Sequence, residues 1–344
     1  MKGLIFTFTL LCGFAAQSFA QAQAQNDPIS TALNEARALI NEGNGKAAVA
    51  KLQSLPDAPA AKDIRVVSLL GVAYYHAGEI PRAIETLAPI VDKLPQDSAQ
   101  WREAVRTLGL SYYIAGRVAD SVPFLEQTSA WEPNNQEMTY ALGMACLQSR
   151  QTAKAREAFA RMFHLAPDSA SANLVTAQML IRLESLEFAE AELKLAVEKD
   201  PKLPQAHYLL GQIAVFRARY DEGIQLLEKE IALNPANAMA YYKLGDAYTL
   251  QLKWDEAIAP LQKSIWLNPY YSGPYILLGK TYLKKKNLST AEAMLKRALQ
   301  FDPNNKSAHY MLAQVFQQTA RPEDARREFE TAEKLKDNLD KIEQ

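Results

Sequence analysis

Small and apolar residues return along this chain at a spacing of 34 residues, with polar turns between them. One copy of the pattern sets the large Leu244 and Leu261 beside the small Gly245 and Ala257, and closes at Pro269. Two apolar stretches of helical length on either side of a polar turn predict a pair of antiparallel helices. The chain is therefore predicted to be a series of helical hairpins.

Three series of residues set the phase of this repeat. Prolines stand 34 residues apart at Pro133, Pro167, Pro201, Pro235, Pro269 and Pro303. A small residue of the first helix keeps the same step at Gly71, Gly109, Gly143, Ala177, Gly211, Gly245, Gly279 and Ala313, apart from the first interval. A small residue of the second helix follows at Ala83, Ser121, Ala155, Ala189, Gly223, Ala257, Ala291 and Ala325. Pro95 lies 38 residues before Pro133, so one joint carries four extra residues.

Each phased position has a physical reason. A glycine inside a helix costs about 1 kcal/mol relative to alanine, so its return at one phase requires close packing. We expect it to let the second helix approach with its small, Ala257-type residue. Gly78 and Gly116 fit a left-handed cap at the hairpin turn, and the phased proline ends the second helix. The Asn-rich segments after Pro133 and Pro303 fit the turn into the next hairpin.

These positions resemble the tetratricopeptide repeat, whose pattern is W-x2-L-G-x2-Y, A-x3-F and P with a period of 34. The best copy reads Tyr241, Leu244, Gly245, Tyr248, Ala257, Leu261, Pro269, and the next reads Tyr275, Leu278, Gly279, Tyr282, Ala291, Leu295, Pro303. The resemblance implies an all-α, right-handed superhelical solenoid of about nine hairpins. Eight repeats over 64–339 are expected to begin near Ile64, Arg102, Gln136, Ala170, Pro204, Ala238, Ser272 and Lys306.

The two ends of the array depart from the pattern. Residues 29–63 fit a degenerate first hairpin, with its turn at Gly43, followed by a linker from Pro56. At the other end Asp337 stands where a proline is expected, so the last helix is predicted to continue from Pro322 to about Ile342, within a capping segment 322–344. Its many charges suit the exposed end of a solenoid.

The first twenty residues differ from the rest of the chain. Lys2 precedes an apolar run over 3–16, and Ser18-Phe19-Ala20 has the small-x-small pattern of a cleavage site. Segment 1–20 is predicted to be a signal peptide cut after Ala20, and 21–28 a disordered mature N-terminus, which places the protein in the periplasm or outside the cell. A retained N-terminal anchor is the alternative, and a lipid attached at Cys12 is disfavoured because Leu11 precedes it.

Composition excludes several other classes. The formal charge is −1 and the basic residues are interspersed, which argues against nucleic acid as a partner. Cleavage would remove Lys2 and Cys12, leaving 37 basic against 39 acidic residues and a single cysteine, Cys146, so no intramolecular disulfide is expected. No later segment of the sequence is apolar enough to span a membrane.

The resemblance also implies where a partner binds. First helices of this family line a concave groove through positions 2, 5, 9 and 12 of each repeat. Aromatic and polar residues at these positions are the candidate partner-binding set: Tyr75, Arg106, Tyr113, Tyr140, Met144, Gln178, Tyr208, Gln212, Tyr242, Asp246, Lys280, Tyr310 and Gln314. The groove is expected to be aromatic in its N-terminal half and rich in amides in its C-terminal half. An extended or a helical peptide fits this expectation.

Catalytic and metal motifs fare poorly by comparison. Gly279-Lys280-Thr281 resembles the end of a phosphate-binding loop, but Pro274 stands where that motif needs glycine. No two of the four histidines have metal-ligand spacing on one helix, and His207 and His309 occupy the bulky packing position of the repeat. Cys146 is expected to be a buried thiol, with a reactive thiol at a hairpin edge as the alternative. No catalytic residue, metal or cofactor is predicted.

A non-catalytic protein–protein interaction scaffold in cell-envelope assembly is thus the expected function. Repeats that clamp a chaperone's C-terminal carboxylate carry Lys and Asn at positions 5 and 9, a set that this chain lacks. Two alternatives stay open: a holdase-like chaperone of the periplasm, and a non-catalytic subunit of an envelope enzyme. The sequence does not fix the oligomeric state.

Overall fold

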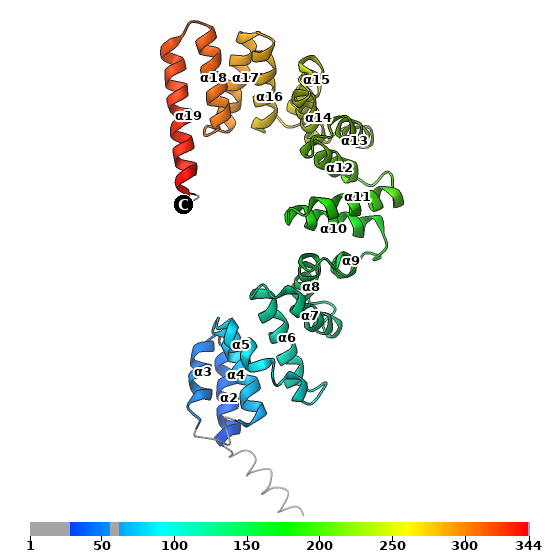
Figure 1. The fold of residues 1–344 in the computed structure, drawn as a ribbon, viewed down its shortest axis with the longest axis vertical. Coiled ribbons are helices and arrows are strands. Elements are labelled where there is room, and N and C mark those ends of the chain that lie inside the picture. The colour runs from blue at the N-terminus through cyan, green and yellow to red at the C-terminus, as the bar shows by residue number, and fades with distance from the viewer. Residues whose placement is uncertain (1–27, 56–61, 343–344) are drawn as a thin grey trace, which may run out of the picture. The chain divides into compact units, whose positions relative to one another are not determined.

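The computed structural model describes residues 28–55 and 62–342, with side chains to Leu335 in the last helix. The signal peptide, the segment before Pro28 and most of the linker after Pro56 lie outside these residues. Within them the regular elements are eighteen α-helices and one short 3-10 helix, with no strand. The prediction of an all-α array of helical hairpins is confirmed (Figure 1).

The helices alternate as first and second members of nine hairpins within the described residues. The first helices are α2 (Pro28–Asn41), α4 (Ile64–His76), α6 (Ala99–Ile114), α8 (Gln136–Gln148), α10 (Ala170–Arg182), α12 (Ala206–Phe216), α14 (Ala238–Leu250), α16 (Ser272–Lys284) and α18 (Lys306–Gln318). The second helices are α3 (Gly45–Gln53), α5 (Ile80–Leu87), α7 (Val118–Trp131), α9 (Thr152–Met162), α11 (Leu186–Lys199), α13 (Tyr220–Leu233), α15 (Trp254–Leu267), α17 (Leu288–Phe301) and α19 (Pro322–Ile342). The 3-10 helix η2 (Val91–Lys93) follows α5.

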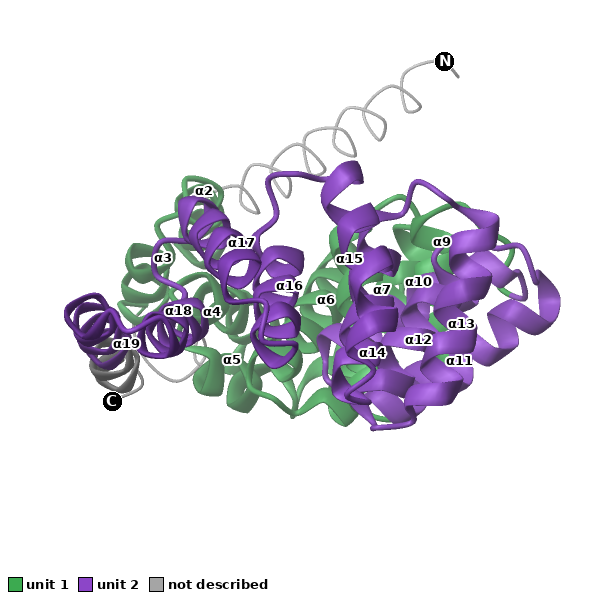
Figure 2. Ribbon diagram, turned by 90° about the horizontal axis from the view of Figure 1, so that it is seen from above, with its two compact units in different colours: residues 1–167 green, residues 168–344 purple. Residues whose placement is uncertain are grey.

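The chain forms two compact units, Met1–Pro167 and Asp168–Gln344 (Figure 2). The 34-residue step runs unbroken across this boundary, so the sequence pattern predicts a continuous array. The second helix before the boundary, α9, ends at Met162, whereas α7 ends at Trp131 and its phase mate would end three residues later than α9 does. No helix of the described residues is both long and apolar enough to cross a bilayer.

Glycines of the first helices admit a leucine, or in one case a phenylalanine, of the partner helix. A Cβ built on Gly245 would lie 2.5 Å from Leu261 Cγ, and one on Gly279 would lie 2.6 Å from Leu295 Cγ. In α8, Gly143 approaches the ring of Phe159 in the same way. The close approach predicted from the glycine series is therefore present. The side chain that it admits is the large residue four positions after the small, Ala257-type residue, because that large residue fills the space a Cβ would take.

Every hairpin turn contains a residue with positive φ. Gly43, Gly78 and Gly116 supply it in the first three turns. The later turns place non-glycine residues there: Arg150, Glu184, Ala218, Leu252, Lys286 and Ala320, each with φ between 56° and 62°. Backbone hydrogen bonds close these turns, as in Lys253 N to Tyr248 O at 2.9 Å. The geometry is the left-handed cap that ends many helices.

The joint between successive hairpins is tied by two kinds of hydrogen bond. Asn135 and Asn305 cap the helices that follow Pro133 and Pro303, where their side chains accept from backbone amides at 3.1 and 3.0 Å. The bulky position of the first helix also reaches back to the proline turn. Tyr275 Oη donates to Pro269 O at 3.1 Å, and His309 Nε2 donates to Pro303 O at 2.9 Å.

Irregular joints shift two helix starts. The four extra residues before Pro133 let α6 begin at Ala99, three residues before the expected Arg102, with Ser98 as its cap. The α12 helix begins at Ala206, two residues after the expected Pro204, because Gln205 adopts a left-handed conformation with φ of 70°. Both shifts change how the first helices meet their neighbours.

Candidate functional site

Successive hairpins of each unit touch along their first helices. In the second unit α12 contacts α14, α14 contacts α16, and α16 contacts α18, while no close contact joins successive second helices among the described residues. In the first unit α2, α4, α6 and α8 form the same series. The side where hairpins approach one another is the inner side of a curved stack. We call this surface the first-helix face; it carries the candidate binding residues.

The first unit brings three of its candidate tyrosines toward the first-helix face. Tyr75 and Tyr113 are half-buried and Tyr140 is exposed. Burial raises the pKa of the Tyr113 hydroxyl, and the neighbouring Tyr140 adds to this effect. Arg106 is held by an ion pair with Glu132 at 3.1 Å, and Met144 is only 8% exposed and belongs to the core.

Three tyrosines meet on the first-helix face of the second unit. Tyr208 comes from α12, Tyr242 from α14, and Tyr271 from the turn before α16. The Tyr242 and Tyr271 rings lie edge to face with centroids 5.2 Å apart. We call these residues the tyrosine cluster. Edge-to-face contact holds ring orientation and leaves one face of a ring free for another partner.

The hydroxyl groups of the tyrosine cluster are neutral at physiological pH. Burial raises the pKa of Tyr242, and the charge and hydrogen bond of the Tyr271 hydroxyl raise it further, followed by Asp246. Burial also raises the pKa of Tyr208, with Tyr271 and Glu230 adding to it. A neutral phenol both donates and accepts hydrogen bonds, which suits the amide groups of a peptide backbone.

Backbone features hold the cluster in place. The ring of Tyr271 lies over Gly273, where an added Cβ would be 2.8 Å from Tyr271 Cε1. Glu230 of α13 is fully buried and accepts from the backbone N–H groups of Gln205 and Tyr208, each at 3.4 Å. This carboxylate supplies the cap that Gln205 lacks at the start of α12, and negative charge there favours the helix dipole.

The remaining polar candidates are partly engaged within the protein. Gln178 Nε2 donates to Gln205 Oε1 at 3.3 Å. Asp246 accepts from Lys243 Nζ at 3.4 Å, in the turn of α14 that also carries Tyr242. Their amide and carboxylate groups lie on the first-helix face beside the tyrosine cluster.

The last two repeats contribute a looser group. Tyr310 is half exposed and its ring lies edge to face on Phe329 of α19, with centroids 5.4 Å apart. Lys280 and Gln314 are half-buried on α16 and α18, and neither forms an ion pair or a side-chain hydrogen bond within the described residues. These side chains extend the first-helix face toward the C-terminus without joining the tyrosine cluster.

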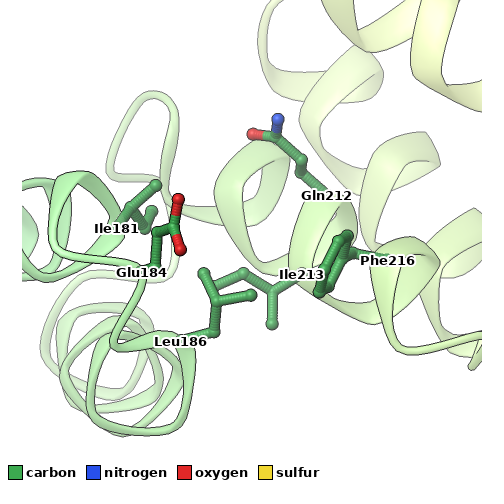
Figure 3. Close-up of a pocket in the computed structure, with 6 residues that line it drawn as sticks. All are labelled: Ile181, Glu184, Leu186, Gln212, Ile213 and Phe216. Atoms are coloured by element: carbon green, nitrogen blue, oxygen red, sulfur yellow. The ribbon is translucent and has the colours of Figure 1, made fainter. Parts of the chain in front are cut away.

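A pocket of about 390 Å³ opens between α10 and α12. Here two successive first helices are not closely packed, which follows from the late start of α12. The pocket is lined by Ile181, Glu184, Leu186, Gln212, Ile213 and Phe216 (Figure 3). Gln212 is the one candidate residue among them. We call this feature the α10–α12 pocket.

Features that resembled catalytic or metal sites have structural roles. The Gly279-Lys280-Thr281 tripeptide lies inside α16, where no loop can surround a phosphate. His309 bonds both Glu328 Oε2 and Pro303 O, so it ties the last hairpin together. Among the described residues no group of three or more His, Cys, Asp or Glu side chains is arranged to hold a metal ion.

Sequence reasoning did not identify Tyr271, Glu184, Leu186, Ile213 or Phe216. Tyr271 stands in the turn before a first helix and Glu184 in a hairpin turn, outside the four groove positions. One signal was available for Tyr271, because an aromatic residue two positions before Gly273 fits a ring lying over a glycine. Phe216 is 77% exposed, which a helical pattern alone does not reveal.

Sequence-family comparison identifies the repeat directly. One model described as Tetratricopeptide repeat matches residues 112–174, 147–213 and 282–340. A second model with the same description matches residues 208–271. No curated protein matches the chain significantly.

Solved structures with a similar arrangement of helices include three bacterial-type repeat proteins. MamA is 22% identical over 48% of this chain and 96% of its own, with a TM-score of 0.44. YrrB, described as a TPR protein with an unusual peptide-binding site, is 22% identical over 52% of this chain and 93% of its own, with a TM-score of 0.46. Pseudomonas aeruginosa PilF is 18% identical over 56% and 88%, with a TM-score of 0.47.

Proposed function

Since this chain is a tetratricopeptide-repeat protein, we propose that it is a non-catalytic scaffold that binds a protein or peptide partner along its first-helix face. The observation that carries the proposal is the tyrosine cluster, in which three successive repeats bring neutral phenol groups together on one surface. Aromatic side chains in such a position are the usual anchors of a protein interface.

The surroundings of the cluster suit a peptide. Tyrosine rings offer apolar contact area, and their hydroxyls offer hydrogen bonds to backbone amides. The amides of Gln178 and Gln212 extend the same surface toward the neighbouring hairpins, and adaptable amide groups orient a bound backbone. An arrangement of this kind binds by shape and hydrogen bonding, and needs no cofactor or metal.

We further propose that the protein acts in the cell envelope or outside the cell. Support comes from the sequence of residues 1–20, with its basic start, apolar run and small residues before Ala20. N-terminal sequencing of the protein from a fractionated exporting cell is expected to begin at Gln21, in the periplasmic or external fraction. A cytoplasmic protein that retains Met1 would contradict export.

Affinity capture tests the scaffold role. The chain is immobilised, and proteins retained from an envelope extract are quantified by mass spectrometry. A Tyr208→Ala, Tyr242→Ala double variant is expected to lose about tenfold or more of a specific partner, because each tyrosine is expected to be an anchor. Tyr270→Ala is the matched control, since Tyr270 is 77% exposed and stands outside the cluster.

The outcomes separate the possible functions. Unchanged capture by a double variant that keeps its helical circular dichroism would sink the binding role of the tyrosine cluster. Retention of many unrelated unfolded chains without a preferred partner would replace a dedicated scaffold with a holdase-like chaperone. A partner that carries enzymatic activity would make this chain the non-catalytic subunit of an envelope enzyme.

A further inference from the structure

The α10–α12 pocket has an apolar interior and a polar edge. Ile181 comes from α10, Leu186 from the start of α11, and Ile213 and Phe216 from α12. Figure 3 shows the Glu184 carboxylate and the Gln212 amide on opposite walls, with Leu186 and Ile213 between them. A cavity of about 390 Å³ falls in the size range of ligand pockets, which is roughly 300–1,000 Å³.

An exposed aromatic ring at this place is not explained by the fold. Phe216 ends α12 and is 77% exposed, while Ile213 one turn earlier is buried. Phe188 of α11 is also exposed, at 40%, and lines a shallower depression that adjoins the pocket and shares Glu184, Leu186 and Phe216 with it. Contiguous exposed apolar surface of this kind marks an interaction site.

The charge at the edge of the pocket is negative. Glu184 and Glu187 form no ion pair among the described residues. The adjoining Arg217 does not offset them, because its guanidinium is bound to Glu190 at 3.0 Å. Arg182 stands two residues before Glu184 but makes no ion pair with it in the described part of the chain, and it does not line the pocket.

We propose that the α10–α12 pocket binds a lysine or arginine side chain of the partner peptide. A long basic side chain joins an apolar stem to a charged end. The stem fits against Leu186, Ile213 and Phe216, and the cation meets the Glu184 carboxylate. The Gln212 carbonyl oxygen accepts a further hydrogen bond from the same cation.

Other occupants fit the pocket less well. An acidic side chain would face Glu184 at close range with no neighbouring cation free to compensate. A purely apolar side chain would cover Glu184 and Gln212 and remove water from them without replacing its hydrogen bonds, which costs free energy. The basic side chain satisfies both the apolar interior and the polar edge.

This inference rests on the proposed peptide-binding function and sharpens it. The tyrosine cluster supplies apolar and backbone contacts from α12 to α16. The α10–α12 pocket lies at the other side of the same helix, α12, and selects for charge. A partner segment that follows the first-helix face past α12 is expected to carry its basic residue at the end nearer α10.

Selection from a random dodecapeptide library displayed on phage tests the inference with the full chain. Three immobilised proteins are compared: the unmodified chain, the charge-reversed Glu184→Lys variant, and Glu198→Lys as a control on the exposed face of α11. Peptides enriched on the unmodified chain and on the control are expected to share a Lys or Arg next to apolar residues. The Glu184→Lys variant is expected to select Asp or Glu at that place.

Each outcome has one meaning. The same residue preference on Glu184→Lys as on the unmodified chain, or enriched peptides without a basic residue, would overturn the pocket assignment while leaving peptide binding intact. Failure to enrich any peptide on the unmodified chain would overturn both this inference and the proposed function. Circular dichroism of each variant establishes that it is folded.

Affinity measurements on one enriched peptide give a second test that does not depend on charge reversal. Replacing its Arg by citrulline, or its Lys by norleucine, is expected to weaken binding to the unmodified chain by roughly threefold to fivefold, the range of a solvent-accessible ion pair. The same replacement is expected to change binding to Glu184→Gln by less than about twofold, because the partner charge is already absent. Equal losses with both proteins would contradict the ion pair.

Discussion

The backbone of Gly245 in α14 lies so close to Leu261 of α15 that a Cβ atom at Gly245 would stand 2.5 Å from Leu261 Cγ. The same pairing recurs 34 residues later between Gly279 and Leu295. A sequence period is thereby converted into a fixed distance between the two helices of a hairpin. The glycine is retained despite its poor helix propensity because an alanine there would displace the leucine.

Replacing Gly245 by Ala is expected to destabilise the protein. Alanine gains about 1 kcal/mol in helix propensity, but the overpacked leucine costs about 1–3 kcal/mol, so the packing term is expected to dominate. Urea unfolding followed by circular dichroism measures the difference. In a Leu261→Ala background the obstruction is gone, and the same Gly245→Ala change is expected to become neutral or stabilising. Equal effects in both backgrounds would refute the pairing.

Replacing Leu252 by Gly is expected to stabilise the protein by about 1 kcal/mol. Leu252 holds φ at 61° in the hairpin turn, where a residue with a Cβ is strained and glycine is not. Its side chain is 67% exposed, so little buried surface is lost. Lys253→Gly is the neighbouring control, since its φ of −85° gives glycine no advantage. A melting temperature that falls in Leu252→Gly would argue against strain in this turn.

Glu190 makes the stability of the second unit depend on acid. Its carboxylate binds Lys194, Arg217 and Arg219 at 2.8–3.0 Å. Burial alone would raise the pKa of Glu190, but the hydrogen bonds from Arg219 and Lys194 outweigh it and lower the pKa to about 2. A carboxyl whose pKa is depressed by folding contributes stability above its unfolded pKa of about 4.3, and this contribution is lost as the pH falls toward 2.

Unfolding measured between pH 5 and pH 2.5 tests this linkage. The unmodified chain is expected to lose up to about 3 kcal/mol over this range from Glu190. Glu190→Gln is expected to be less stable at pH 7 and to lose less stability on acidification. Glu198→Gln, which removes an exposed carboxylate from the same helix, is the control. A Glu190→Gln variant with the same pH dependence as the unmodified chain would contradict the assignment.

Cys146 is expected to react slowly with thiol reagents. Its side chain is buried in α8, and burial raises the pKa of the thiol to about 11, with Glu126 adding to the effect. Since the thiolate is the reactive form, labelling by an aromatic disulfide at pH 8 is expected to follow unfolding of the first unit. Labelling of the native chain at the rate of a free thiol would instead place Cys146 at a reactive hairpin edge.

The helical hairpins could be predicted because their causes are local. Glycine, alanine and proline at one phase dictate where helices approach and end, and Asn135 and Asn305 cap the helices that follow. The left-handed turns were visible only at Gly78 and Gly116. In later repeats Leu252 and Lys286 adopt the same conformation, and neither residue type indicates a positive φ in a sequence.

The candidate site was less accessible to sequence reasoning because it depends on contacts between repeats. Family positions led to Tyr208 and Tyr242 but not to Tyr271, which reaches the cluster from a turn. The α10–α12 pocket exists because Gln205 delays the start of α12, a backbone event without a sequence signature. The division after Pro167 was hidden for the same reason, since the repeat period continues through it.

Site-specific photo-crosslinking tests the central claim most directly. Benzoylphenylalanine replaces one of four glutamines at a time: Gln212 or Gln314 on first helices, and Gln225 or Gln300 on the second helices α13 and α17. The proposal predicts that a captured partner crosslinks from Gln212 and Gln314 and not from Gln225 or Gln300. Crosslinks that form equally from all four positions, or only from the second helices, would contradict binding at the first-helix face.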